Sequence, residues 1–118
     1  MKKPGVGLSH LRVTLSDTFY IGPGRADLLE GIAETGSISE AARRMGMSYK
    51  RAWSLVQALN SGFPAQLVDT QRGGSGQGAS LTAEGRAVLD AYRRMQAATR
   101  DAIAPDVAAL VRDMSRRK

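Results

Sequence analysis

Residues 36–53 have the sequence GSISEAARRMGMSYKRAW, which predicts two short helices separated by a tight turn. Ser37 and Glu40 have the spacing of a capping box, in which the serine side chain accepts a backbone hydrogen bond and the glutamate reaches back to the serine. Gly46 permits a sharp reversal of the chain, and Ser48 can cap the helix that follows. The stretch therefore predicts a helix-turn-helix with helices over residues 37–45 and 48–60.

The charge of the chain favours a nucleic-acid partner. It has 17 lysine and arginine residues against 11 aspartate and glutamate residues, which gives a net charge of +6. No acidic residue lies between Glu40 and Asp69, whereas Lys50 and Arg51 are at the start of the predicted second helix. Helix-turn-helix proteins place the start of that helix in the DNA major groove, so cations there lie close to phosphates and base edges.

The exposed face of the second helix is expected to carry Lys50, Ser54 and Gln57, which recur at helical spacing. Lys50 can donate to guanine O6 or N7, or it can pair with a phosphate, and the sequence does not separate these two roles. Arg51 is expected to project sideways, where it makes a phosphate contact or none.

Two aromatic residues, Tyr49 and Trp53, lie at the border between the buried and the exposed face of this helix. An aromatic residue in such a place usually packs against the core, which is the expectation for Trp53. Tyr49, at the start of the helix, can equally hydrogen-bond a phosphate or stack over a base edge.

The sequence before the motif predicts one strand and one helix. Apolar residues alternate with polar ones over 11–15, which predicts a strand with one buried face, while 19–21 is apolar without a clear period. Glycine and proline at 22–24 break the chain, and a helix is expected over 25–35.

The sequence after the motif predicts a two-stranded wing and a long helix. Strands are expected over 67–72 and 79–81, joined by the glycine-rich stretch 73–78. A helix is expected from 83 to about 104, where Pro105 interrupts it before one more amphipathic segment. We therefore expect one mainly helical α+β winged helix-turn-helix domain over 1–118, with an N-terminal strand region (8–22), a three-helix core (24–60), the wing (66–82) and a C-terminal helical dimerisation segment (83–116).

The composition leaves little material for an enzymatic site. The chain contains no cysteine and one histidine, His10, so neither a disulfide nor a metal site is expected. The glycine-rich stretch lacks the lysine of a phosphate-binding loop and returns to a strand, which makes nucleotide hydrolysis a poor interpretation. No apolar run approaches the roughly 20 residues of a membrane span, and the first residues lack the apolar core of a signal peptide. We therefore expect a cytoplasmic protein that is not an enzyme and needs no cofactor.

These residues together resemble the N-terminal DNA-binding domain of ModE-type molybdenum-responsive regulators. The similarity covers about residues 11–95 and is most specific in the Ser-Tyr-Lys-x-Ala-Trp run from Ser48 to Trp53 and in the glycine-rich stretch. A more distant similarity to LysR-type helix-turn-helix domains is confined to the two-helix unit. The resemblance rests on Gly36 to Ser39, Ala41, Ala42, Gly46, Ser48 to Lys50, Ala52, Trp53, Asn60, Leu67, Val68, Gly73, Gly74, Gly76, Gly78, Leu81, Thr82, Gly85 and Tyr92.

The resemblance implies a homodimer that binds a roughly palindromic operator on double-stranded DNA and pairs through its N-terminal strand and long C-terminal helix. That helix also carries a longer apolar seam than a small domain needs, which calls for a partner helix. The expected dimerisation residues are Val88, Ala91, Tyr92, Met95, Ala98 and Ala102. The expected DNA-binding residues are Ser37, Ser39, Ser48, Tyr49, Lys50, Arg51, Ser54, Gln57, Arg72, Gly73, Gly74, Ser75 and Gln77.

The chain departs from the ModE pattern in its wing and in its length. Thr70 stands where the family usually has an arginine, although Arg72 lies on the same face of the strand, and Ser75 replaces a lysine of the loop. ModE regulators carry molybdate-binding domains after the DNA-binding domain, for which 118 residues leave no room. If the chain is complete, the signal that regulates it is expected to come from a separate effector-sensing protein or from another small ligand, or there is no such signal.

Two other functions stay open at this point. A protein-interaction module would use the same fold, but its interface core would be depleted of charge, unlike the basic face predicted here. A protein that coats the chromosome without sequence preference would bind any duplex with similar affinity and a steep salt dependence.

Overall fold

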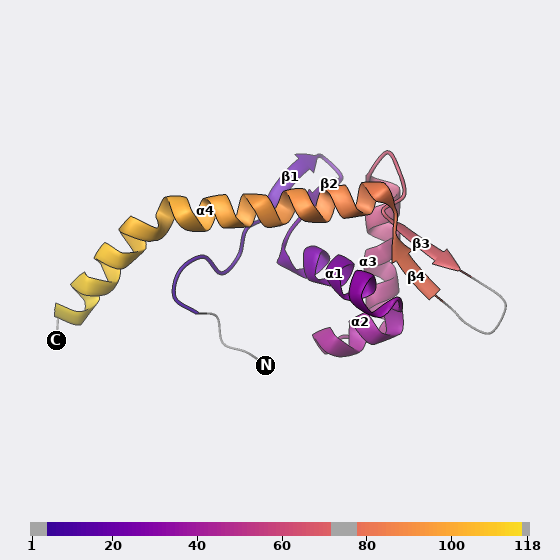
Figure 1. The fold of residues 1–118 in the computed structure, drawn as a ribbon, viewed down its shortest axis with the longest axis horizontal. Helices are drawn as coiled ribbons and strands as arrows, with labels where there is room; N and C mark the ends of the chain where they lie inside the picture. Colours follow the sequence, from indigo (N-terminus) through magenta and orange to yellow (C-terminus); the bar gives the residue numbers. More distant parts are fainter. Residues whose placement is uncertain (1–4, 72–77, 117–118) are drawn as a thin grey trace.

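The structure of the chain is a computed structural model that describes residues 5–71 and 78–116. Within these residues, three short helices, two antiparallel hairpins and one long helix form a domain with dimensions of 62 × 29 × 22 Å (Figure 1). The elements in chain order are β1 (Val13–Ser16), β2 (Phe19–Ile21), α1 (Pro23–Thr35), α2 (Ile38–Met45), α3 (Tyr49–Gly62), β3 (Val68–Gln71), β4 (Gly78–Leu81) and α4 (Ala83–Arg116).

Helices α1, α2 and α3 pack around one apolar core, against which α4 and both hairpins lie. Gly36 and Gly46 end α1 and α2 in the left-handed conformation, with φ of 73° and 68°, so the chain turns sharply after each helix. The predicted mainly helical winged helix-turn-helix fold is confirmed. The largest fully buried side chains are those of Ile21, Leu28, Leu29, Ile32, Val56, Leu59, Leu67, Val68 and Tyr92.

The N-terminal region forms a hairpin where the sequence predicted a single strand. Val13 of β1 lies opposite Ile21 of β2, and the register shifts just before Ser16. Leu15 lies at this irregularity and is 54% exposed, so the alternation that predicted its burial is wrong at this position. Phe19 and Ile21 of β2 supply the buried apolar surface instead.

Strands β3 and β4 form the predicted wing. Val68 lies opposite Leu81 and Gln71 opposite Gly78 in an antiparallel ladder. The strand predicted to reach Arg72 is described as far as Gln71. The predicted DNA contacts of the wing loop fall outside the described residues: Arg72, Gly73, Gly74, Ser75 and Gln77.

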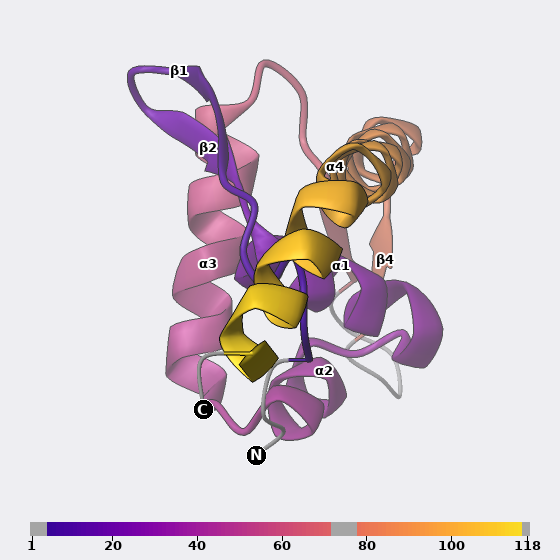
Figure 2. The ribbon, with the colours of Figure 1, turned by 90° about the vertical axis from the view of Figure 1, so that its left-hand side faces the viewer.

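Helix α4 is continuous over 34 residues, so the predicted interruption at Pro105 is wrong. A proline inside a helix removes one backbone hydrogen bond and crowds the carbonyl four residues earlier, but a bend can accommodate it. The C-terminal part of α4 turns away from the axis of its first part in Figures 1 and 2. The proline therefore redirects this helix without ending it.

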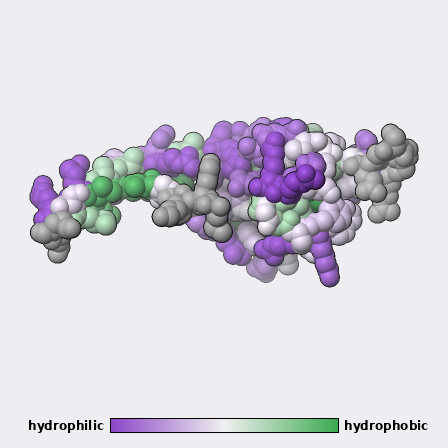
Figure 3. Space-filling model, turned by 90° about the horizontal axis from the view of Figure 1, so that it is seen from below, coloured by the Kyte–Doolittle hydropathy of each residue, from purple (hydrophilic) through white to green (hydrophobic). Residues whose placement is uncertain are grey.

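Residues 97–116 of α4, here called the arm, extend beyond the helical core. Leu110 and Met114 are 63% and 72% exposed, and Figure 3 shows the hydrophobic surface along this part of the molecule. Ile103 and Val107 line a groove of about 420 Å³ together with the N-terminal segment at Leu8. The arm thus carries apolar side chains that its own domain does not cover.

Tyr92 belongs to the core and not to the exposed seam in which it was predicted. Its side chain is fully buried, and its hydroxyl donates a 2.6 Å hydrogen bond to the carbonyl oxygen of Leu11. Gly85 and Leu89 are buried on the same face of α4. Periodicity identified an apolar stripe but did not distinguish a surface that faces the core from one that faces a partner.

Burial raises the pKa of the Tyr92 hydroxyl above its ordinary value, because the ionised form would lose solvation. The fold therefore favours the neutral phenol. This stabilisation is complete below about pH 10, the ordinary tyrosine pKa, and is lost as the pH rises through the higher pKa of the folded protein.

Tyr92→Phe is expected to lower the free energy of unfolding at pH 8 by about 1 kcal/mol, the usual contribution of one hydrogen bond. It should also weaken the fall in stability above pH 10, because phenylalanine does not titrate. Urea unfolding of both proteins at pH 8 and above pH 10 measures the two effects. Equal losses with pH in the two proteins would contradict the proposed titration of Tyr92.

Candidate nucleic-acid interface

Helix α3 has one polar face that is open to solvent. Lys50, Ser54 and Gln57 are all exposed, and their spacing aligns them along one side of the helix. The opposite face of the helix is buried in the core. Its buried residues are Ala52, Val56 and Leu59. The predicted division of α3 into a core face and an exposed face is therefore present.

The start of α3 favours the approach of an anion. Ser48 caps the helix, as predicted, by accepting a 3.1 Å hydrogen bond from the backbone N–H of Arg51. The N-terminus of a helix carries a partial positive charge and backbone N–H groups that bind phosphates. Lys50 and Arg51 add two cations to the first turn, and no carboxylate among the described residues lies within 4.0 Å of either.

The two arginines of α2, unlike Lys50 and Arg51, pair with acidic residues. Arg43 pairs with Glu40 at 3.1 Å, and Arg44 pairs with Glu34 at 2.5 Å. The positive charge of the stretch between Glu40 and Asp69 is therefore partly neutralised in the folded domain, because acidic residues just before this stretch pair with its first two arginines. Its uncompensated positive charge is concentrated at the start of α3.

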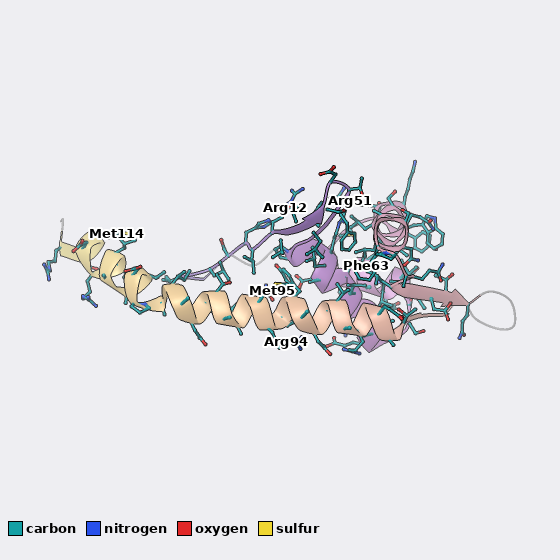
Figure 4. All side chains as sticks on the ribbon, turned by 90° about the horizontal axis from the view of Figure 1, so that it is seen from above. Arg12, Arg51, Phe63, Arg94, Met95 and Met114 are labelled. Atoms are coloured by element: carbon teal, nitrogen blue, oxygen red, sulfur yellow. The ribbon has the colours of Figure 1, made fainter. Side chains whose placement is uncertain are left out.

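Arg51 lies on the other side of α3 from the wing. Figure 4 looks down α3 and shows Arg51 on the side of hairpin β1–β2, with α4 on the opposite side of the domain. Its side chain is exposed. This position agrees with the sideways projection expected from the sequence.

Tyr49 and Trp53 form an aromatic pair beside the polar face of α3. Their rings are nearly parallel, with 6.4 Å between the centroids and 15° between the planes. Trp53 is half-buried and packs against the core, as expected, whereas Tyr49 is 51% exposed. The pair therefore joins the core to the solvent-facing start of the helix.

Asn60 fixes the wing to the end of α3. Its side-chain oxygen accepts hydrogen bonds from the N–H groups of Leu67 and Val68, at 2.8 and 3.0 Å. Its amide nitrogen donates to the carbonyl oxygen of Val68 at 3.0 Å. These three bonds hold the first residues of β3 against α3. The sequence pattern alone did not predict this role, because an asparagine near a helix end is usually a terminating residue.

Asn60→Ala is expected to lower the free energy of unfolding by about 2–3 kcal/mol, because it leaves partly buried backbone groups of Leu67 and Val68 without partners. Thermal unfolding measures the effect. Ser61→Ala is the matched control, since the exposed Ser61 hydroxyl bonds within α3 to the carbonyl of Gln57 and should contribute little. Similar losses in both variants would contradict the positioning role of Asn60.

The start of α2 carries the two remaining predicted serines. The Ser37 side chain accepts a 3.1 Å hydrogen bond from the N–H of Glu40, and Ser39 is exposed in the first turn. The other half of the predicted capping box is wrong. Glu40 pairs with Arg43 instead, and the Thr35 hydroxyl accepts the hydrogen bond from the Ser37 N–H at 3.2 Å.

Comparison with known proteins identifies the unit built from these elements. The model of the family described as "Bacterial regulatory helix-turn-helix protein, lysR family" matches residues 25–86, from α1 to the start of α4. The chain belongs to this family. It carries a helix-turn-helix DNA-binding domain like that of ModE regulators, as the sequence resemblance predicted.

Curated relatives of this lysR-family chain match about 70% of it or slightly less. The molybdenum-pterin-binding protein MopB of Rhodobacter capsulatus is 46% identical over 78 residues, which are 65% of this chain and 29% of MopB. The transcriptional regulator ModE of Haemophilus influenzae is 36% identical over 83 residues, and the DNA-binding transcriptional dual regulator ModE of Escherichia coli K12 is 37% identical; each match covers 70% of this chain and 32% of the relative. The chain thus spans about a third of the length of these relatives.

A solved structure extends the comparison to three dimensions. The DNA-binding domain of CbnR, crystallised in a complex with DNA, superposes with a TM-score of 0.56 at 31% sequence identity. The alignment covers 73% of this chain and 95% of the CbnR chain. The lysR-family fold of the chain is therefore supported by sequence and by structure.

A second surface of the lysR-family chain lies between α4 and the N-terminal hairpin. A groove of about 330 Å³ has walls that are almost entirely apolar. It brings together three of the predicted dimerisation residues, Leu15 of the N-terminal strand that is also expected to pair, and Phe63, which the sequence did not indicate. Ala98 and Ala102 lie farther along, exposed on the arm. The groove is lined by Leu15, Ile21, Phe63, Glu84, Ala87, Val88, Ala91 and Met95.

The described residues contain neither a group of metal ligands nor a membrane-spanning helix. Within residues 5–71 and 78–116, no three histidine, aspartate or glutamate side chains are grouped as metal ligands would be. None of the helices described in this domain is long and apolar enough to cross a bilayer.

Proposed function

We propose that this chain is a sequence-specific regulator of transcription that binds double-stranded DNA as a homodimer. The observation that carries the proposal is the exposed polar face of α3, where Lys50 and Arg51 have no acidic partner among the described residues. Such a helix enters the major groove with its first residues at the base edges. Such a regulator works at the chromosome, so we place it in the cytoplasm.

The residues along the face of α3 have distinct roles in this proposal. Lys50 lies at the centre of the first turn and donates to guanine or to a phosphate, while Ser54 and Gln57 continue the contact along the groove. Arg51, on the side away from the wing, contacts the phosphate backbone. Ser48, Ser37 and Ser39 lie at the two helix N-termini, where backbone N–H groups bind phosphates. The loop residues Arg72, Gly73, Gly74, Ser75 and Gln77 would contact the backbone or the minor groove beside α3.

A twofold dimer would cover the apolar groove beside α4. Val88, Ala91 and Met95 line this groove, and Leu15 adds an exposed apolar side chain at its edge. Ala98 and Ala102 would extend the contact onto the arm. Twofold symmetry would place two copies of α3 about one turn of DNA apart, roughly 34 Å, and would require an inverted repeat in the operator. Sedimentation at micromolar concentration tests the dimer, and a monomer would contradict it.

Selection of bound sequences from a random duplex pool, at near-physiological salt, tests the DNA-binding function. The expected result is an enriched inverted repeat whose halves are centred about ten base pairs apart. Retention of DNA without an enriched sequence would indicate a chromosome-coating protein. No retention of DNA would instead favour the protein-interaction module.

A further inference from the structure

The first turn of α3 places an apolar ring next to a polar face. Tyr49 is 51% exposed, unlike the residues of the opposite face of the helix, which are buried. The other large exposed apolar side chains of the described residues lie on the N-terminal segment, the β1–β2 hairpin and the arm. Tyr49 is therefore the apolar surface that α3 itself presents to whatever lies against its polar face.

Trp53 holds the Tyr49 ring in a defined position. The near-parallel rings, 15° apart in plane and 6.4 Å apart in centroid, have the geometry of a favourable aromatic pair. Trp53 is itself packed against the hydrophobic core. Because the exposed ring is supported in this way, it loses little side-chain freedom when it contacts a ligand, which favours affinity.

The side of α3 that carries this pair is the side of the wing. Tyr49, Trp53 and Asn60 follow one another at intervals of four and seven residues, which aligns them along one flank of the helix. Asn60 bonds to the first residues of β3. Viewed down the axis of α3, the aromatic ring therefore lies between the polar row of Lys50 and the flank of the helix that meets the wing at Asn60. A duplex held by both elements would bring a base edge against it.

We propose that Tyr49, supported by Trp53, recognises the C5-methyl group of a thymine in the major groove. The thymine methyl is the apolar group that a base pair presents there, and apolar side chains contact it in a sequence-specific manner. The proposal rests on the DNA-binding function proposed above and adds the base that one position of α3 selects. The proposal also gives two consecutive residues different roles, since Lys50 supplies a positive charge and Tyr49 supplies an apolar contact to the DNA.

Replacement of thymine by deoxyuridine, one position at a time in the selected operator, tests the proposal by removing only the methyl group. At one position in each half-site, affinity is expected to fall three- to fivefold, about the effect of exposing one buried methyl group. The same scan is repeated with Tyr49→Ala and Tyr49→Phe, with folding checked by circular dichroism. Tyr49→Ala should bind the thymine and deoxyuridine operators equally, whereas Tyr49→Phe should keep the preference for thymine because it keeps the ring.

Three outcomes would overturn the proposal and leave the DNA-binding function intact. The wild-type protein could select an operator but tolerate deoxyuridine at every position. The preference for thymine could persist in Tyr49→Ala, which would assign it to another residue. Tyr49→Phe could bind all operators as weakly as Tyr49→Ala, which would indicate that the hydroxyl contacts a phosphate. Failure to select any operator would instead contradict the proposed function itself.

Discussion

Lys50→Ala is expected to weaken binding to the selected operator by about ten- to a hundredfold, while the protein stays folded and dimeric. The expectation follows from the exposed position of Lys50 at the centre of the first turn of α3, without an acidic partner among the described residues. A base contact in the major groove contributes about 1–3 kcal/mol of discrimination, which corresponds to this loss of affinity. Titration of labelled duplexes with the protein measures it.

The pattern of the loss distinguishes the two roles of Lys50. If Lys50 donates to guanine, the operator should be affected much more than an unrelated duplex, and specificity at one base pair should relax. If Lys50 pairs with a phosphate, all duplexes should be affected alike, and the slope of log affinity against log salt should fall by about 0.9. Arg94→Ala is the matched control, because it removes one exposed positive charge from α4, away from α3. Equal effects of the two variants would contradict a role for Lys50 in the interface.

Gly85→Ala is expected to destabilise the domain by about 3 kcal/mol or more, which makes it the most damaging single-methyl change in the helices. A Cβ atom at Gly85 would lie 2.0 Å from the carbonyl oxygen and 2.9 Å from the carbonyl carbon of Leu67. Both are backbone atoms, so the clash cannot be relieved by rotation of a side chain, and overpacking of this kind is costly. Urea unfolding gives the change in free energy.

Gly24→Ala provides the control for Gly85→Ala. A Cβ atom at Gly24 meets nothing within 4 Å, and the residue lies in the first turn of α1. Alanine is there expected to stabilise the protein by up to about 1 kcal/mol, because it restricts the unfolded chain. If both substitutions had the same sign, the close approach of α4 to Leu67 would not be the cause of the loss.

The helix-turn-helix could be predicted from local sequence signals. Gly36 and Gly46 adopt the left-handed conformation that glycine favours, and Ser37 and Ser48 accept the capping hydrogen bonds. Each of these features depends on residues a few positions apart. Local chemistry therefore determined the boundaries of α1, α2 and α3 to within two residues.

The errors arose where contacts distant in sequence decide the structure. Tyr92 is buried because it meets Leu11, 81 residues earlier in the chain, and an apolar stripe does not reveal such a contact. The capping-box error is an exception, since Glu40 pairs with Arg43 three residues later and the Ser37 N–H bonds to Thr35 two residues earlier. Asn60 acts through the backbone of residues 67–68, so its role became visible once the wing was in place.

Helix α4 connects the base of the wing to the arm, and this continuity has a mechanical consequence. Gly85 packs against Leu67 at one end, and about 20 residues of helix follow before Pro105, a rod about 30 Å long. Tyr92, which is buried and bonded to Leu11, ties the middle of this rod to the core as well. The arm therefore projects from a helix that is tied to the core at both Gly85 and Tyr92. We therefore expect a partner bound to the arm to be held at a set position relative to α3 and the wing.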